Sequence, residues 1–439
     1  MDKLVVKGPG RLAGTMNVSG SKNTALPLMA GAILAPGIST ISNIPSLRDI
    51  STFARVMRVT GTRVDIDDSA GLVTIDATNI EDTVAPYELV KRMRASFYML
   101  GALLGRCGEA KVSLPGGCAW GPRPVDLHIK GVQAMGATVD LEQGYVIAKA
   151  VGGRLKGGSF RLEPSSVGAT INLLLAGSTA RGGSRIENAA MEPDVVVFGE
   201  CLREMGARIS GLGTSTIEIE GVDELKPVDF ANCPDRIELG TYMIAAALCG
   251  EPGSPVRING ADDRHLGKVF VDAFTATGAS IEVGDNYIDV TAPEKLSSVS
   301  IETGIYPGFP TDLQAQWTIL LSQSEGNGKV VDKVYHDRFK HIPELHRMGI
   351  NAIVVGNEVV VQGKTKLTGA QVMSTDLRAS VSLVLAGMVA SGTTEVLRVY
   401  HLDRGYENLE NKLSGAGIDI TRESYDEWAS PVEERQMSA

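Results

Sequence analysis

Gly136-Ala137-Thr138-Val139 marks the end of a predicted helix and the start of a predicted hairpin, and this pattern returns five more times. A glycine ends the helix, and residues of alternating polarity follow it. The other copies begin at Gly61, Gly206, Gly278, Gly349 and Gly415, at intervals of 66 to 75 residues. Self-similarity at a nearly constant interval is the signature of a repeat architecture. The chain is therefore predicted to consist of six units of one size.

Each unit is predicted to contain two helices of different character. One is amphipathic and precedes the glycine, as in residues 47–60, 125–135 and 195–205. The other is apolar on all sides, which is typical of a buried helix, and is predicted at 22–35, 94–105, 166–180, 235–250, 311–323 and 376–390. Hairpins such as Thr216-Ile217-Glu218-Ile219-Glu220 alternate with a period of two, so one sheet face is exposed. A unit therefore has the order β-α-β-α-β-β, with a buried helix beneath a mixed sheet.

The sixth unit lacks its last strand, because the chain becomes polar after Ile418-Asp419-Ile420. The N-terminus resembles the missing piece, since Val5-Val6-Lys7-Gly8 matches Val360-Val361-Gln362-Gly363 at an offset of 355 residues. We therefore predict an α/β protein of two domains, residues 22–233 with repeats one to three, and residues 1–21 and 234–439 with repeats four to six. The chain then crosses twice between the domains, which predicts a hinge and a ligand cleft. Residues beyond about Glu423 are predicted to form a frayed, charged tail.

The composition limits the classes of function. The chain of 439 residues is 43% hydrophobic and carries a net charge of -10, which argues against a nucleic-acid surface. No run approaches the roughly 20 apolar residues that a membrane helix needs, and the N-terminus has no apolar signal core. Five widely spaced cysteines indicate reduced thiols and a cytoplasmic protein. Six histidines lack metal-ligand spacing, so no catalytic metal is predicted. Neither a Walker loop nor a Gly-x-Gly-x-x-Gly motif after a strand occurs, and no other cofactor is predicted.

Cations stand at the beginnings of several predicted buried helices. Capping explains Ser166 and Thr311 well, but it does not explain Lys22, Arg94, Arg236 or Arg378, because cations are disfavoured beside the positive end of a helix dipole. Cations gathered at helix N-termini suggest a shared anion such as a phosphate. A second series consists of Asp-Arg pairs at residues 263–264, 337–338 and 403–404. Each pair, taken alone, is explained by an aspartate that caps a helix and an arginine exposed to solvent.

The second unit differs from the others in one turn. Pro115-Gly116-Gly117-Cys118-Ala119-Trp120-Gly121-Pro122-Arg123-Pro124 is an expanded loop with three prolines and three glycines. Long loops on a rigid scaffold usually carry function. A thiol here, with Arg123 close by, is unlike the buried, inert cysteine of a protein core. Cys118 is therefore a candidate nucleophile or proton donor, and the residues alone leave both roles open.

These residues resemble the enolpyruvyl transferases, whose fold is a two-domain inside-out α/β barrel. The cysteine loop followed by Val125-Asp126-Leu127-His128 resembles the UDP-N-acetylglucosamine 1-carboxyvinyltransferase branch in particular. Further matching motifs are Ser21-Lys22-Asn23, Met93-Arg94-Ala95-Ser96, Ser166-Val167-Gly168-Ala169-Thr170, Pro234-Asp235-Arg236-Ile237-Glu238, Phe309-Pro310-Thr311-Asp312, Thr375-Asp376-Leu377-Arg378 and Asp403-Arg404-Gly405-Tyr406-Glu407. The resemblance covers nearly the whole chain.

The resemblance implies that the enolpyruvyl group of phosphoenolpyruvate moves to the 3′-hydroxyl of UDP-N-acetylglucosamine, with release of phosphate. This is the first committed step of peptidoglycan precursor synthesis, and no obligate protein partner is expected. Lys22, Arg123 and Arg404 would hold phosphoenolpyruvate. Asp312 would deprotonate the sugar hydroxyl, and Cys118 would protonate the methylene carbon and carry the adduct 2-(S-cysteinyl)pyruvic acid O-phosphothioketal. The implied substrate contacts are Asn23, Arg94, Arg123, Pro124, Val125, Asp126, Leu127, Ser166, Val167, Gly168, Asp312, Val334, Arg338, Asp376 and Arg378.

One position departs from the family pattern. Where this branch usually has a lysine that contacts the nucleotide, two positions before Ser166, the chain has Pro164. A charged hydrogen bond of this kind is worth about 1.5–3 kcal/mol. A related transferase acting on another uridine nucleotide therefore stays open. A second alternative is 5-enolpyruvylshikimate-3-phosphate synthase, although that enzyme lacks the cysteine loop. A third is a non-enzymatic repeat protein such as a sliding clamp, which would have no use for a loop that presents a thiol.

Overall fold

The computed structural model describes residues 1–91, 93–115, 125–335 and 337–427. The chain forms two compact units, each with its own hydrophobic core. Unit 1 comprises Met1–Val18, Ile237–Gly304 and the chain from Gly308 onward, and unit 2 comprises Ser19–Arg236 with Ile305–Pro307. The division into domains at residues 22 and 233 stays a prediction.

In the part of the chain that the structure describes, each unit contains three sheets, and all six have four strands in the same topology. In each sheet, one outermost pair of strands is parallel and the other neighbours are antiparallel, which confirms six β-α-β-α-β-β repeats with mixed sheets. The sheets of unit 2 are β14(Asp229–Ala231)-β3(Ile38–Ser42)-β5(Leu72–Asp76)-β4(Arg63–Asp67), β6(Val84–Ala85)-β7(Glu109–Ser113)-β9(Tyr145–Ala150)-β8(Ala137–Glu142) and β10(Ser159–Arg161)-β11(Gly183–Glu187)-β13(Thr216–Glu220)-β12(Arg208–Ser210). Those of unit 1 are β16(Ser280–Gly284)-β17(Tyr287–Thr291)-β15(Val256–Asn259)-β2(Thr15–Asn17), β18(Ile301–Thr303)-β19(Asn327–Asp332)-β21(Glu358–Gln362)-β20(Ala352–Val355) and β22(Gln371–Met373)-β23(Gly392–Leu397)-β1(Asp2–Gly8)-β24(Asp419–Ser424).

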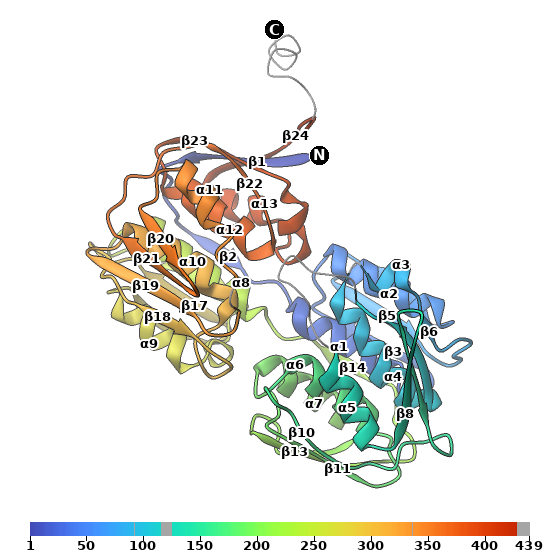
Figure 1. Cartoon of the computed structure of the whole chain (residues 1–439). Helices are drawn as coiled ribbons and strands as arrows, with labels where there is room; N and C mark the ends of the chain where they lie inside the picture. Colours follow the sequence, from blue (N-terminus) through green and yellow to red (C-terminus); the bar gives the residue numbers. More distant parts are fainter. Residues whose placement is uncertain (92, 116–124, 336, 428–439) are drawn as a thin grey trace. The chain divides into compact units, whose positions relative to one another are not determined.

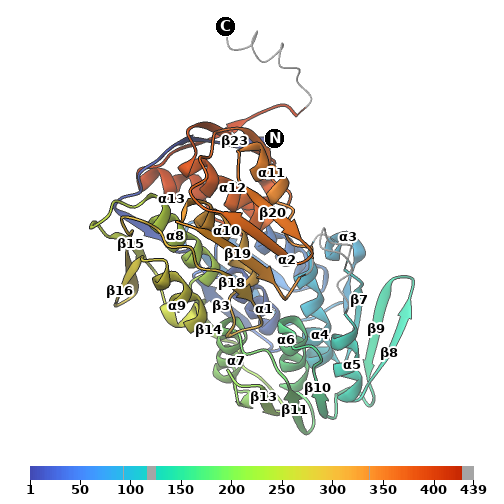
Figure 2. The ribbon, with the colours of Figure 1, turned by 60° about the vertical axis from the view of Figure 1, so that its left-hand side comes forward.

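One helix of each repeat is buried among the sheets, as the sequence predicts. The buried helices are α1(Lys22–Ala32), α4(Met99–Cys107) and α6(Val167–Gly177) in unit 2, and α8(Arg236–Cys249), α10(Gln314–Gln323) and α12(Leu377–Val389), mostly in unit 1. The outer helices are α2(Arg48–Val59), α5(Asp126–Ala134), α7(Pro193–Glu204), α9(Lys268–Ala276), α11(Ile342–Arg347) and α13(Leu409–Gly415) (Figure 2). Close packing of α4 on α6 requires glycine at one position, because a Cβ on Gly101 would lie 2.4 Å from the Asn172 carbonyl oxygen.

Two predicted buried helices begin with a separate 3₁₀ turn. The segment predicted at 94–105 divides into η1(Arg94–Tyr98) and α4, and that at 311–323 divides into η3(Thr311–Leu313) and α10. Such turns are frequent at helix N-termini. In both repeats, the 3₁₀ turn carries a predicted site residue, Arg94 or Asp312.

The N-terminal strand completes the last sheet, as the sequence offset predicts. β1 pairs antiparallel with both β23 and β24, and Figures 1 and 2 show it beside them. The predicted fraying beyond Glu423 is wrong for the residues before 428. The ladder continues past β24, because the Tyr425 N–H donates to the Met1 carbonyl over 2.7 Å and the Met1 ammonium group donates to the Tyr425 carbonyl over 2.8 Å.

Two buried histidines, one in each unit, make stability depend on pH. His128 of α5 is 3% exposed and His341 before α11 is 2% exposed. Burial, helped by the positive charges of Arg94 and Arg338 respectively, lowers the pKa of each imidazole to about 3. Below pH 6.5 the unfolded chain protonates both side chains while the folded chain does not, so acid favours unfolding.

We expect the free energy of unfolding to fall by up to about 1.4 kcal/mol per pH unit for each histidine between pH 6.5 and 5. Chemical denaturation at several pH values measures this slope. In the His341→Gln variant, the change in the free energy of unfolding per pH unit should decrease by the contribution of one histidine, because glutamine binds no proton. Equal slopes in the wild type and the variant would show that His341 is protonated in the folded chain.

Candidate functional site

A half-buried carboxylate held by two arginines forms the centre of the site in unit 1. Arg338 Nη2 lies 2.6 Å from Asp312 Oδ1, and Arg378 Nη2 lies 2.8 Å from Asp312 Oδ2. The two arginine side chains are 10% and 7% exposed, whereas Asp312 retains 29%. Burial alone would raise the pKa of Asp312, but Arg378 and Arg338 together hold it well below its usual range. The carboxylate is therefore ionised and partly open to solvent.

Neutral polar groups fix the positions of these two arginines. Arg338 Nη1 donates to the Thr311 hydroxyl over 2.7 Å, and that hydroxyl donates to Asp332 over 2.7 Å. Thr311 is therefore not the predicted helix cap, because its hydroxyl is used by a side-chain network. Arg378 Nη1 donates to the Tyr406 hydroxyl over 3.4 Å, and Thr241 lies 2.8 Å from the same hydroxyl. Satisfied buried networks of this kind are rigid.

The remaining predicted residues of unit 1 lie on segments next to this cluster. Asp376 caps α12, since its Oδ1 accepts from the backbone N–H groups of Arg378 and Ala379 over 2.9 and 3.1 Å. Val334 follows β19 and donates its N–H to Asp332 over 2.9 Å. Arg404 ends η4(Val399–Arg404), a 3₁₀ helix that packs against α12. The structure thus brings Asp312, Arg338 and Arg378 into direct contact and places Asp376, Val334 and Arg404 on adjoining segments.

The first residues of α1 carry the predicted phosphoenolpyruvate ligand of unit 2. Ser21 caps the helix by accepting from the Thr24 N–H, and Lys22 and Asn23 follow. Lys22 Nζ lies 3.3 Å from Asp49 Oδ2 of α2, with side chains only 11% and 7% exposed. The cation at this helix N-terminus therefore has a protein carboxylate beside it.

A second ion pair joins the two stretches at which the chain passes between the units. Asp194 of α7 accepts from Ser21 and Thr24 hydroxyls over 3.1 and 2.7 Å, and Arg236 Nε lies 3.3 Å from its other oxygen. Burial raises the pKa of Asp194, but Arg236 and the hydroxyls outweigh burial and lower it. Sequence reasoning missed Asp49 and Asp194. Both lie in the first turn of an outer helix, where an acid is expected for the helix dipole alone.

The predicted nucleotide-binding segments of unit 2 meet around His128. Ser166 caps α6 by accepting from the Ala169 N–H over 3.3 Å, which confirms the predicted cap. A Cβ on Gly168, two residues further on, would lie 3.1 Å from the His128 ring, so α5 and α6 approach closely there. Asn172 of α6 lies 2.7 Å from His128 Nδ1 and also donates to the Phe97 carbonyl of η1 over 3.2 Å. The segments bearing Arg94, Val125–Leu127 and Ser166–Gly168 are thereby fixed to one another.

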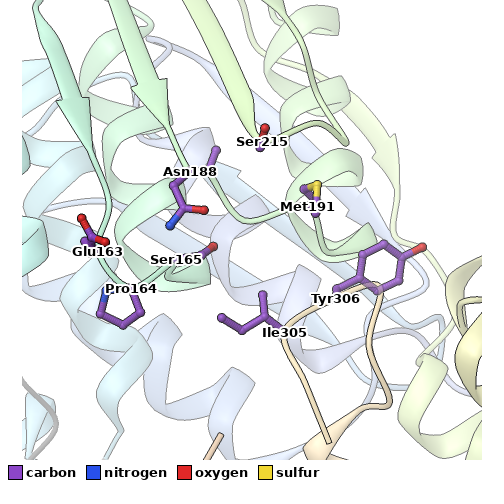
Figure 3. Close-up of a pocket in the computed structure, with 9 residues that line it drawn as sticks. Glu163, Pro164, Ser165, Asn188, Met191, Ser215, Ile305 and Tyr306 are labelled. Atoms are coloured by element: carbon purple, nitrogen blue, oxygen red, sulfur yellow. The ribbon is translucent and has the colours of Figure 1, made fainter. Parts of the chain in front are cut away.

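A cavity opens beside the N-terminus of α6, and Figure 3 shows the side chains around it. Its volume is about 570 Å³, and all its lining residues belong to unit 2. They are Glu163, Pro164, Ser165, Asn188, Ala189, Met191, Ser215, Ile305 and Tyr306. Pro164 thus gives the wall an apolar ring at the position where the resemblance leads one to expect a lysine.

Four of the five cysteines have the properties of core thiols. Burial raises the pKa of Cys201, Cys233 and Cys249 to about 12, and it also raises that of Cys107. The fifth, Cys118, lies outside the described residues together with Arg123 and Pro124. Within the described ranges, no group of three or more His, Cys, Asp or Glu side chains could hold a metal ion. No helix in that part of the chain is long and apolar enough to cross a membrane.

Comparisons with known proteins agree with this architecture. The model of the EPSP synthase (3-phosphoshikimate 1-carboxyvinyltransferase) family matches residues 6–413. UDP-N-acetylglucosamine 1-carboxyvinyltransferase of Chlorobaculum parvum is 50% identical over 98% of this chain and 100% of its own length. The enzyme of the same name from Chloroherpeton thalassium is also 50% identical, over 98% of this chain and 99% of its own.

Solved structures share the fold. The enolpyruvyl transferase NikO from Streptomyces tendae is 26% identical and aligns with a TM-score of 0.86 over 97% of this chain and 99% of its own. EPSP synthase from Acinetobacter baumannii, 18% identical, aligns with a TM-score of 0.76 over 97% and 100% and shows the fold alone. The architecture is thus the inside-out α/β barrel. Since relatives at 50% identity match almost end to end, the chain belongs to the EPSP synthase family of enolpyruvyl transferases, together with the UDP-N-acetylglucosamine 1-carboxyvinyltransferases.

Proposed function

We propose that this protein transfers the enolpyruvyl group of phosphoenolpyruvate to the 3′-hydroxyl of UDP-N-acetylglucosamine and releases phosphate. The observation that carries this proposal is the full-length similarity, at 50% identity, to transferases of that name. The reaction would be the first committed step of peptidoglycan precursor synthesis, which takes place in the cytoplasm.

Anion binding explains the arrangement of cations. Phosphoenolpyruvate brings a phosphate and a carboxylate, and the nucleotide sugar brings two further phosphates. Lys22, Arg123 and Arg404 would hold phosphoenolpyruvate, while Arg338 and Arg378 would complete its surroundings. The nucleotide sugar would bind to unit 2, where Asn23, Arg94, Arg123 to Leu127 and Ser166 to Gly168 would contact it. Backbone N–H groups at the beginning of α6 favour a phosphate group.

The chemistry would proceed by addition and elimination. The sugar 3′-oxygen attacks C2 of phosphoenolpyruvate and loses its proton to Asp312, while Cys118 delivers a proton to C3. The Cys118 thiolate then takes a proton back from C3 of the tetrahedral ketal, the C2–C3 double bond forms again, and the C2–O bond to phosphate breaks. An enolpyruvyl ether and inorganic phosphate are the products. The implied covalent adduct would form when the Cys118 sulfur, in place of the sugar oxygen, adds to C2 and the thiol proton goes to C3.

Asp312 can act as a base only if its surroundings change on binding. A carboxylate that two arginines hold far below its usual pKa is a good hydrogen-bond acceptor but a weak base. When phosphoenolpyruvate binds, its anionic groups share Arg338 and Arg378 and also repel the carboxylate. Both effects raise the pKa of Asp312 toward the range in which proton transfer is efficient.

Pro164 affects the identity of the acceptor substrate in this proposal, because it replaces a lysine that would contact the nucleotide. The missing lysine leaves a related uridine nucleotide as the alternative acceptor, and shikimate-3-phosphate is the acceptor of the sister enzymes. Phosphate release should require both phosphoenolpyruvate and UDP-N-acetylglucosamine and should not occur with shikimate-3-phosphate. Release with shikimate-3-phosphate, or none with UDP-N-acetylglucosamine, would contradict the proposed function.

The variant Asp312→Asn should show whether Asp312 acts as a catalytic base or has only a structural role. Asparagine keeps the size and part of the hydrogen bonding but takes up no proton, so kcat should fall by about 10²–10⁴-fold. Steady-state kinetics of phosphate release measures this loss. The Asp289→Asn variant, which alters a carboxylate paired with Arg257 on the sheet of β15 and β17, is the control and should keep kcat. Near-normal kcat with lowered stability would assign Asp312 a structural role only.

Cys118 should be the reactive thiol of the five. Because burial raises the pKa values of Cys107, Cys201, Cys233 and Cys249, these four should react slowly at neutral pH. Fosfomycin, an epoxide phosphonate that resembles phosphoenolpyruvate, should alkylate Cys118 and stop turnover, and peptide mass spectrometry locates the label. Cys118→Ala should lose activity, whereas Cys118→Asp retains an acid and should stay active in the presence of the inhibitor. Label on another cysteine, with Cys118 unmodified, would refute this assignment.

A further inference from the structure

The last described residues of the chain contact both ends of one short helix of the site. Residues 422–427, here termed the C-terminal segment, end β24 and continue beyond it. The helix is η4(Val399–Arg404), whose last residue is the proposed phosphoenolpyruvate ligand Arg404. The inference below therefore rests on the proposed function.

Arg422 holds the C-terminal end of η4. Its guanidinium group contacts both oxygens of Asp403, at 2.7 and 3.2 Å, and both oxygens of Glu410, at 2.7 and 3.3 Å. Asp403 directly precedes Arg404, and Glu410 lies in the first turn of α13. Two carboxylates on one planar guanidinium fix the direction in which the chain passes from η4 into α13. Both contacts raise the pKa of Arg422, whose charge is therefore permanent.

Glu427 and Tyr425 hold the N-terminal end of η4. Glu427 Oε1 accepts from Arg398 Nε over 2.8 Å and also from Nη2, and the Tyr425 hydroxyl accepts from the Arg398 N–H over 3.3 Å. Arg398 has a φ of 57°, which places a non-glycine residue in the left-handed region. Such a conformation persists only where its surroundings fix it, and here the C-terminal segment supplies those contacts.

The C-terminal segment is in turn fixed to the first residues of the chain. Met1 and Tyr425 exchange two hydrogen bonds, and Asp2 accepts from Arg422 and from the Ser424 hydroxyl over 3.4 and 3.3 Å. Because β1 is an inner strand of its sheet, this attachment joins the segment to a strand that is paired on both sides. The segment thus connects a fixed sheet to both ends of η4.

We propose that Arg422, Tyr425 and Glu427 are positioning residues for Arg404. Their proposed action is indirect, through η4. They hold η4 by its two ends, so that the Arg404 side chain leaves the backbone from a fixed point and meets phosphoenolpyruvate without prior ordering. Loss of either contact would let η4 move and would weaken phosphoenolpyruvate binding more than nucleotide-sugar binding.

Glu427→Gln tests the N-terminal contact and Arg422→Lys the C-terminal one. Each should raise KM for phosphoenolpyruvate about 3- to 30-fold, the usual range for a residue that acts through another. KM for UDP-N-acetylglucosamine and the melting temperature should stay unchanged. Asp289→Asn, which alters another guanidinium–carboxylate pair of unit 1, is the matched control and should change neither KM. Equal increases in both KM values, together with a lower melting temperature, would indicate general destabilisation and overturn the proposal.

Combination with Arg404→Lys shows whether the effect passes through Arg404. If it does, adding Glu427→Gln to Arg404→Lys should raise KM less than Glu427→Gln does in the wild type, because the guanidinium group that the contact positions has been replaced. Independent, multiplying effects of the two substitutions would overturn the proposal.

Hydrogen exchange of the backbone amides of residues 399–405 provides a readout without substrates. Exchange there should be faster in Glu427→Gln and in Arg422→Lys than in the wild type and in Asp289→Asn. Unchanged exchange would overturn the positioning role even if the protein turned over no phosphoenolpyruvate. An unaltered KM in Arg404→Lys would instead refute the proposed role of Arg404 while faster exchange still supported the contact with η4.

Discussion

The charge of Asp312 is the constraint on which unit 1 depends. Arg338 and Arg378 are almost fully buried, and an unpaired buried guanidinium would cost several kcal/mol. One carboxylate therefore has to serve both. This pairing joins three segments, because Asp312 lies in η3, Arg338 follows β19 and Arg378 begins α12. Breaking it by removing one partner would leave a buried charge and loosen all three.

Buried cations of unit 2 also need negative charges nearby, and other carboxylates supply them. Lys22 lies beside Asp49 and Arg236 beside Asp194, so cations that the helix dipole disfavours are stabilised by carboxylates from outer helices. Under the proposed function, a phosphate that binds there would compete with a protein carboxylate that is already present. Its affinity would be the difference between the two interactions.

Periodicity made most of the fold predictable. Five of the six buried helices lie within the predicted ranges, and the sixth, α4, extends two residues past its predicted end, to Cys107. The N-terminal strand completes the sixth sheet, and both outcomes follow from local pattern and from the repeat. Thr311, Asp49 and Asp194 show where the sequence was insufficient. Each has a partner from another segment or repeat, and a pattern of one helix start cannot reveal it. The tail beyond Glu423 was misjudged for the same reason, since Glu427 is held by Arg398 and not by its neighbours in sequence.

Comparison of the repeats distinguishes structural features, which all copies share, from residues that differ between copies and can carry function. Six copies share one sheet topology and one buried helix, so these features alone specify no reaction. The polar residues at the buried-helix starts differ from copy to copy: Lys22, Arg94, Ser166, Arg236, Asp312 and Arg378. These positions thus hold four cations, one hydroxyl and one carboxylate, and Arg94 and Asp312 lie in the 3₁₀ turns η1 and η3 that precede α4 and α10. Because the beginning of a helix offers backbone N–H groups without partners in the helix, the side chain placed there decides whether an anion is favoured.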